Sequence, residues 1–123
     1  DGKLLIASRP SFADVVAIDI ASGKVVWRFE VEGYRADHMG LSPDGTKVAV
    51  SASTGNVVHV LDINTGKQVG KFTSGNSPHE NVFSKDGSKI YHASIGYVFT
   101  PLDPNFFDWT KGERVFQVVD AHN

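Results

Sequence analysis

Two short motifs recur along this chain in a fixed order, and this repeat constrains the fold more than any other feature of the sequence. The dipeptide Asp-Gly occurs at 1–2, 44–45 and 86–87, at intervals of 43 and 42 residues, and a short hydrophobic run follows each copy. A second aspartate, Asp19 or Asp62, stands 18 residues after the first two Asp-Gly aspartates. A period of this length is typical of architectures that are built from repeated units.

The segments between the turn residues predict β-strands rather than helices. They are rich in Val, Ile and aromatic residues, and Gly, Asp or Ser separates them, which is the composition of strands joined by tight turns. No segment shows a long apolar period of 3.6 residues, so almost no helix is expected. Four strands in a repeat of about 42 residues predict one blade of a β-propeller. The predicted fold is all-β: a β-propeller segment of four-stranded antiparallel blades.

The repeat divides residues 1–123 into parts of three blades within a single segment. Residues 1–33 would supply the second to fourth strands of blade one, residues 34–76 a whole blade two, and residues 77–123 the first three strands of blade three. The segment is therefore expected to be incomplete at both ends. Since a propeller needs at least four blades to close, the open strand edges are expected to pair with the remaining blades of a longer protein or with another copy of the chain.

The stretch Ser42–Lys47, followed by Val60–Lys67, resembles the YVTN-type propeller repeat. The resemblance extends over the whole chain, whereas the Gly-His and Trp-Asp pairs of WD-repeat propellers are missing. It implies the fold and leaves the function open, because propellers host many unrelated functions.

The composition excludes several classes of function. The chain has 12 Lys and Arg against 14 Asp and Glu, so no basic excess would attract nucleic acid. Its apolar runs are only a few residues long, so no segment is expected to span a membrane. The chain has no Cys, which excludes disulfides and thiolate chemistry and is compatible with oxidising and reducing compartments alike.

The loops on one face of the predicted blades carry the unusual residues. Antiparallel pairing places 9–14, 32–38, 73–80 and an insertion within 95–113 on this face, while short Asp-Gly, Ser-Gly and Thr-Gly turns close the other. Length variation on one face of a repeat protein marks a binding face. The aromatic residues of the insertion are expected to pin the loop onto its blade, with stacking on a ligand as the alternative. They are Phe99, Phe106, Phe107 and Trp109.

Two histidines occupy nearly equivalent positions in successive repeats. His38 and His79 stand six and seven residues before an Asp-Gly aspartate, just ahead of the predicted inner strands Met39–Ser42 and Asn81–Ser84. There they would point towards the mouth of the central channel, so they are the predicted catalytic residues. His59 is expected to be an ordinary strand residue on a polar face. The predicted ligand-binding residues are Arg9, Tyr34, Arg35, Asn81 and His92.

Two stretches, Tyr34–Gly40 and Ser77–Ser94, look like those of bacterial and fungal propeller proteins that include polysaccharide lyases. In those lyases, hub histidines cleave glucuronate-containing glycans. The resemblance implies a carbohydrate or acidic small ligand and β-elimination at a uronate. That reaction needs a base for the C5 proton, a group that neutralises the carboxylate and an acid for the leaving oxygen. Histidine and tyrosine suit the proton transfers, and arginine or asparagine suits the neutralisation.

Two other classes of function fit the same face. His38, His79 and Glu80 have the donor atoms of a metal site, but so few ligands identify no metal, and no cofactor is assigned. A non-catalytic propeller would instead present this face to a protein or glycan. Loss of activity without loss of fold on replacing either histidine would indicate a lyase, and metal removal by a chelator would indicate a metal site.

Overall fold

The computed structural model describes residues 2–98 and 105–122, with residues 105–107 described by their backbone alone. In these ranges the chain forms ten β-strands and two short 3-10 turns, η1 and η2. The elements in chain order are β1 (Leu4–Arg9), η1 (Pro10–Phe12), β2 (Asp14–Asp19), β3 (Val25–Glu30), β4 (Ala36–Leu41), β5 (Lys47–Ala52), β6 (Val57–Asp62), β7 (Gln68–Thr73), β8 (Pro78–Phe83), β9 (Lys89–Ser94), η2 (Asn105–Thr110) and β10 (Phe116–Asp120).

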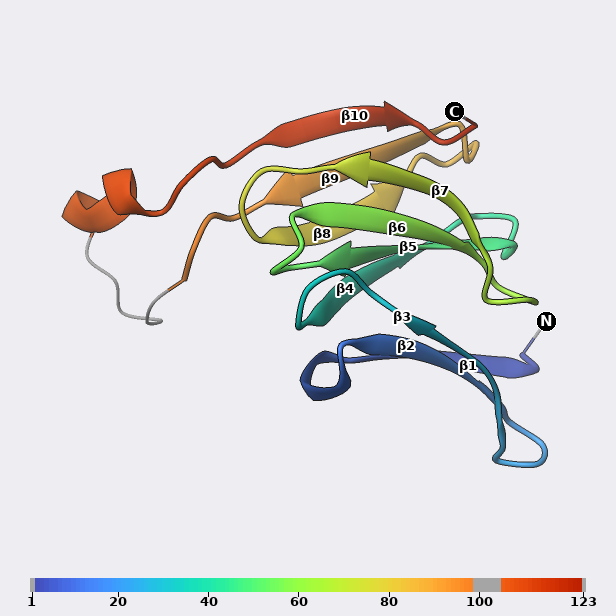
Figure 1. Cartoon of the computed structure of the whole chain (residues 1–123). Coiled ribbons are helices and arrows are strands. Elements are labelled where there is room, and N and C mark those ends of the chain that lie inside the picture. Colours follow the sequence, from blue (N-terminus) through green and yellow to red (C-terminus); the bar gives the residue numbers. More distant parts are fainter. Residues whose placement is uncertain (1, 99–104, 123) are drawn as a thin grey trace.

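The strands form three antiparallel sheets that lie one against the next (Figure 1). The first sheet has the order β1-β2-β3, the central sheet β4-β5-β6-β7, and the third β8-β9-β10, so each strand pairs with its neighbour in the chain. The all-β prediction is confirmed. The inner strands β4 and β8 begin at Ala36 and Pro78, three residues before the predicted starts, and this extension brings both hub histidines into strands.

The middle strands of the central sheet, β5 and β6, are buried on both faces because a sheet packs on each side of them. Val50 of β5 and Leu61 of β6 belong to a cluster that faces the first sheet and includes Val15. Ala49 and Val58 belong to a second cluster, which they share with Ile90 of the third sheet. Successive side chains of a strand point to opposite faces, so alternate residues of one strand supply two cores.

Tight turns close one end of the sheets, and the longer loops lie together at the other end, as the sequence predicts (Figure 1). In the turn between β4 and β5, one carboxylate oxygen of Asp44 accepts hydrogen bonds from the hydroxyls of Ser42 and Thr46 and from the Thr46 backbone N–H. These bonds lower the pKa of Asp44 to about 2, and the Asp86 turn repeats the arrangement with the same effect on the pKa of Asp86.

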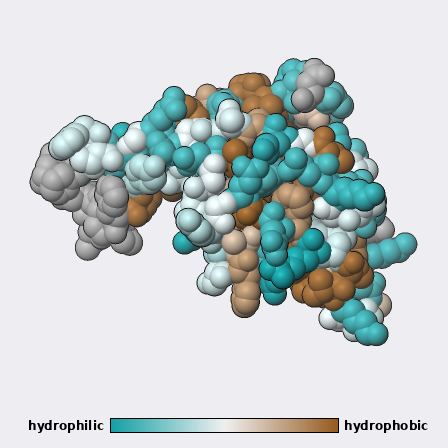
Figure 2. Space-filling view, in the orientation of Figure 1, coloured by the Kyte–Doolittle hydropathy of each residue, from teal (hydrophilic) through white to brown (hydrophobic). Residues whose placement is uncertain are grey.

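Hydrophobic side chains also reach the surface. Patches lie over the outer strand β10 and at the end of the first sheet, near the turn between β2 and β3 (Figure 2). Phe116 and Val118 of β10 are 71% and 56% exposed, and in the described ranges β10 pairs only with β9. No helix in the described part of the chain is long and apolar enough to cross a membrane.

Candidate functional site

The inner strands β4 and β8 approach each other closely. A Cβ atom at Gly40 of β4 would overlap the carbonyl oxygen of Asn81 of β8, so only glycine permits this approach. The Asn81 side-chain amide donates to the Ser51 hydroxyl at 2.8 Å, and this hydroxyl donates to the carbonyl oxygen of His79 at 2.9 Å. The backbone contact therefore sets the distance between the two strands that carry the histidines, and the hydrogen bonds tie β8 to Ser51 of the neighbouring strand β5.

Both inner strands contain a β-bulge where the histidines lie. Between Ala36 and Met39 the pairing advances three residues along β4 and two along β5, so Asp37 and His38 together face one residue. Around His79 it advances two residues along β8 and one along β9. A bulge interrupts the alternation of a strand and redirects side chains, which turns those of Asp37, His38 and His79 towards one another.

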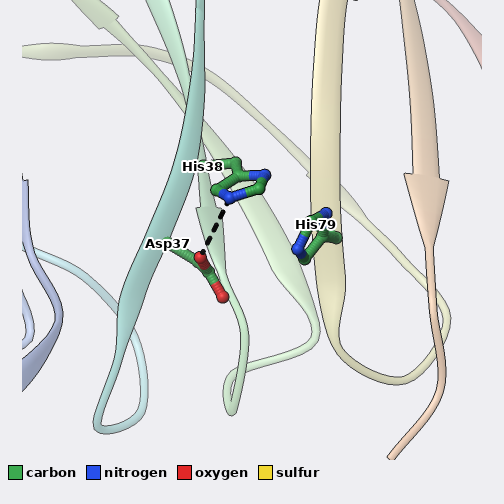
Figure 3. Close-up of side chains that lie close together, drawn as sticks. All are labelled: Asp37, His38 and His79. Carbon is green, nitrogen blue, oxygen red and sulfur yellow. Dashed lines mark ion pairs between the residues drawn. The ribbon is translucent and has the colours of Figure 1, made fainter. Parts of the chain in front are cut away.

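Asp37, His38 and His79 form the candidate site, called here the hub cluster (Figure 3). One ligand atom from each residue lies within 4.8 Å of the others. Nε2 of His38 is 3.9 Å from Oδ1 of Asp37, and the ring centroids of His38 and His79 are 3.8 Å apart at an interplanar angle of 60°. The His38 side chain is 49% exposed, so solvent and ligands can reach the cluster.

Neighbouring groups hold the polar atoms of the hub cluster. Oδ2 of Asp37 accepts a hydrogen bond of 2.7 Å from the Ser53 hydroxyl and lies 3.4 Å from Nε of Arg35. Its other oxygen, Oδ1, is the one near His38. On the opposite edge of the His38 ring, Nδ1 lies 3.5 Å from Oε2 of Glu80.

The hub cluster lines a cleft of about 660 Å³. Loops of the central sheet contribute polar groups to it, and the start of the inserted loop contributes a more apolar wall. These lining residues are Arg35, Ser53 and Asn56 from the former, and Ile95, Tyr97 and Val98 from the latter. The cleft therefore combines a cation, two imidazoles and an apolar surface.

Other predicted ligand-binding residues lie elsewhere. Tyr34 is 85% exposed and is not one of the residues that line the cleft. Arg9 is bound through Nε and Nη2 to the fully buried carboxylate of Asp14, at 2.8 and 2.6 Å, and its guanidinium stacks over Phe12. The hydrogen bond from Arg9 is the main cause that lowers the pKa of Asp14, and Arg28 contacts the same carboxylate.

Asn81 and His92 lie below the surface of the strands. Nδ1 of His92 is 2.9 Å from both the carbonyl oxygen of Glu80 and the side-chain oxygen of Asn81. Both are acceptors, so Nδ1 carries the proton, and Nε2 accepts from the Ser74 hydroxyl at 2.7 Å. Burial lowers the pKa of His92. The ring of His92 thus connects β9 to β8 and to the loop between β7 and β8.

The structure adds Asp37 and Ser53 to the site, which the sequence analysis did not single out. Strict counting back from the Asp-Gly aspartates would have found Asp37, because Asp37 and His79 both stand seven residues before them. By the same count, His38 and Glu80 are equivalent, at six residues. The first of these repeats thus carries an acidic residue followed by a histidine, and the next carries a histidine followed by an acidic residue.

The aromatic residues of the inserted loop are only partly described. Trp109 is 83% exposed. Phe99 and the side chains of Phe106 and Phe107 lie outside the described residues.

No protein-family model matches this chain, and no curated protein is detectably similar to it in sequence. Similar solved structures include hydrazine synthase of Kuenenia stuttgartiensis, which is 27% identical with a TM-score of 0.70 over 78% of this chain and 27% of that one. Dihydro-heme d1 dehydrogenase NirN is 18% identical (TM-score 0.72), over 98% of this chain and 22% of that chain. A chain of the mitotic checkpoint complex is 14% identical (TM-score 0.72), over 100% of this chain and 32% of that chain.

These neighbours are propeller-like, and together with the antiparallel sheets they confirm a β-propeller segment. This chain spans about a quarter to a third of the length of each of them. Membership of the YVTN-type repeat family stays a prediction.

Proposed function

We propose that this β-propeller segment binds a divalent metal ion at the hub cluster, with Asp37, His38 and His79 as ligands. The observation that carries the proposal is the convergence of three donor atoms, from two strands, within 4.8 Å of one another. Imidazole nitrogen and carboxylate oxygen are the donors that Zn²⁺ and neighbouring first-row ions take in proteins. Three protein ligands leave coordination positions open, as in catalytic rather than structural zinc sites.

The surroundings of the hub cluster support this proposal. The Ser53 hydroxyl and the Arg35 guanidinium engage the far oxygen of Asp37, as outer partners of a metal-bound carboxylate do. Arg35 also lines the cleft beside the cluster. A metal ion and a guanidinium in one cleft would together favour an anionic ligand.

Metal binding to the purified protein tests the proposal. Equilibrium dialysis against Zn²⁺ or Co²⁺ should give one tightly bound ion per chain, and a chelator should remove it. His38→Ala and His79→Ala should each lose that ion while retaining the circular dichroism of the parent. His122→Ala is the matched control, since His122 is an exposed histidine in the turn after β10. The absence of a bound ion, or its retention in both cluster variants, would overturn the proposal.

A polysaccharide lyase that acts at a uronate is the second candidate function. Its support is that His38, His79 and Arg35 line one cleft, so proton-transfer groups and a group that neutralises a carboxylate are adjacent. Incubation with glucuronate-containing glycans should release an unsaturated uronate, detected by its ultraviolet absorbance. Arg35→Lys should slow the release, whereas Arg114→Lys should not. If neither metal nor product is found, a scaffold that presents this face to a protein or glycan is the remaining class.

A further inference from the structure

Glu80 connects the two inner strands on the side of His38 that faces away from Asp37. It follows His79 on β8, and its Oε2 lies 3.5 Å from Nδ1 of His38 on β4. The other ring nitrogen, Nε2, is 3.9 Å from Oδ1 of Asp37. The two nitrogens of one imidazole therefore face two different carboxylates.

The carboxylate of Glu80 is itself held in place. Its Oε1 accepts a hydrogen bond of 3.3 Å from the backbone N–H of Asn81, which leaves Oε2 directed at His38. Its backbone carbonyl accepts a hydrogen bond from the buried ring of His92, at 2.9 Å. Backbone and side chain are thus both anchored, although the Glu80 side chain is 54% exposed.

We propose, on the basis of the metal site proposed above, that Glu80 is a positioning residue for His38. Its carboxylate accepts the Nδ1–H of the imidazole, and this bond leaves the lone pair of Nε2 free for the metal that Asp37 and His79 share. Metal-binding histidines characteristically donate their second N–H to a carboxylate or carbonyl, which selects the tautomer and orients the ring. Glu80 is not among the three residues whose donor atoms lie within 4.8 Å of one another. It would therefore contact the ligand His38 rather than the metal ion.

The repeat relates the four residues of this arrangement in two pairs. Glu80 and His38 occupy equivalent positions of successive repeats, as do His79 and Asp37. The second pair supplies two of the proposed ligands from corresponding bulge positions. In the first pair, the imidazole is the ligand and the carboxylate is its partner.

Glu80→Gln tests the proposal, because it removes the charge while keeping the size and an acceptor oxygen. Glu30→Gln is the control, since Glu30 is an exposed glutamate at the end of β3 in the first sheet and pairs with Arg28. Purified proteins would be titrated with Co²⁺ and followed by its visible absorption. Two-dimensional ¹⁵N NMR of the imidazoles would report the tautomer of His38 in the metal-free protein.

For Glu80→Gln we expect Co²⁺ affinity that is about 10- to 100-fold weaker, with the absorption spectrum of the bound ion unchanged. The fraction of His38 that carries its proton on Nδ1 should fall in the metal-free variant, and Glu30→Gln should match the parent in both measurements. A purely structural defect would not change the fraction of His38 that carries its proton on Nδ1.

Three outcomes would overturn the proposal in distinguishable ways. If the parent protein binds no Co²⁺, both the proposed metal site and the proposed role of Glu80 are wrong. Binding that requires His38 but is unchanged in Glu80→Gln removes the role of Glu80 alone and leaves the metal site standing. A changed Co²⁺ spectrum in Glu80→Gln would make Glu80 a ligand rather than a positioning residue.

Discussion

The backbone of Gly40 on β4 lies so close to the carbonyl oxygen of Asn81 on β8 that no side chain fits at position 40. This contact sets how closely the two inner strands approach. It lies near the bulges that carry His38 and His79, whose ring centroids are 3.8 Å apart. The geometry of the hub cluster therefore depends on a residue that has no side chain.

Gly40→Ala should destabilise the protein and weaken metal binding at the hub cluster. The added methyl group would force β4 and β8 apart, and overpacking of this kind costs about 1–3 kcal/mol. Thermal unfolding and Co²⁺ titration would measure the two effects. Gly70→Ala is the control in the same sheet, because a Cβ there meets Val60 only at ordinary contact distance, 3.5 Å. Equal effects of the two substitutions would contradict this account.

Asn76→Ala should loosen the inserted loop that forms one wall of the cleft. The side chain of Asn76 donates to the Tyr97 hydroxyl at 2.9 Å and accepts from the Glu113 backbone N–H at 2.8 Å, so it joins both ends of the loop. Amide hydrogen exchange near Tyr97 and Glu113 should become faster, with a loss of global stability of about 1 kcal/mol or more. Asn64→Ala, at an exposed turn, should leave that exchange unchanged.

The free energy of unfolding should decrease as the pH falls below the ordinary histidine pKa of 6.5. Burial lowers the pKa of both His59 and His92 in the folded chain, so the unfolded chain takes up protons first and acid favours unfolding. The contribution of these rings to the free energy of unfolding is fully present above pH 6.5. It is lost as the pH falls towards their pKa values in the folded chain. The Asp44 and Asp86 carboxylates, with pKa values of about 2, lose their contribution only below the ordinary value of 3.8.

Urea titrations at about pH 7.5 and about pH 5.5 would measure this difference. His122→Ala removes an exposed histidine and should leave the difference unchanged. Equal free energies of unfolding at the two pH values in the parent would show that the buried rings do not control acid stability.

Arg9→Ala should lower stability without changing metal affinity, because the structure pairs Arg9 with the buried Asp14 carboxylate. Arg28 would remain beside Asp14, so we expect a loss of about 1–3 kcal/mol, below the usual effect of an unpaired buried charge. Denaturant unfolding and Co²⁺ titration would be compared with those of Arg114→Ala, which removes an exposed arginine. Weaker metal or ligand binding in Arg9→Ala alone would instead support the predicted role of Arg9 in ligand binding.

His59 shows where reasoning from strand alternation was wrong. The sequence analysis placed it on a polar face, whereas it is 2% exposed and packs edge-on against Phe29 of the first sheet. Nε2 accepts from the Glu32 backbone N–H at 3.2 Å, and Nδ1 lies 2.7 Å from the Gln68 side-chain oxygen. Alternation identifies which residues share a face, but not what packs against that face.

The repeat, the strands, the tight turns and the end of the sheets that carries the longer loops could all be predicted from the sequence. These features follow from local rules: turns need Asp-Gly or Thr-Gly at set positions, and strands need β-branched residues between them. His38 and His79 were also singled out in this way, because they stand at nearly equivalent positions of successive repeats.

The groups that meet around those histidines could not be predicted, because they depend on how strands pair and sheets pack. The bulges at Asp37 and His79 depend on pairing with neighbouring strands, and the approach of β4 to β8 depends on the contact between Gly40 and Asn81. The contact between Gly40 and Asn81 joins residues of successive repeats, so no local pattern specifies its distance. For that reason the sequence did not show that Asp37 and Ser53 join the site. The pairing of Arg9 with Asp14 was also missed, although these residues lie opposite each other on the neighbouring strands β1 and β2.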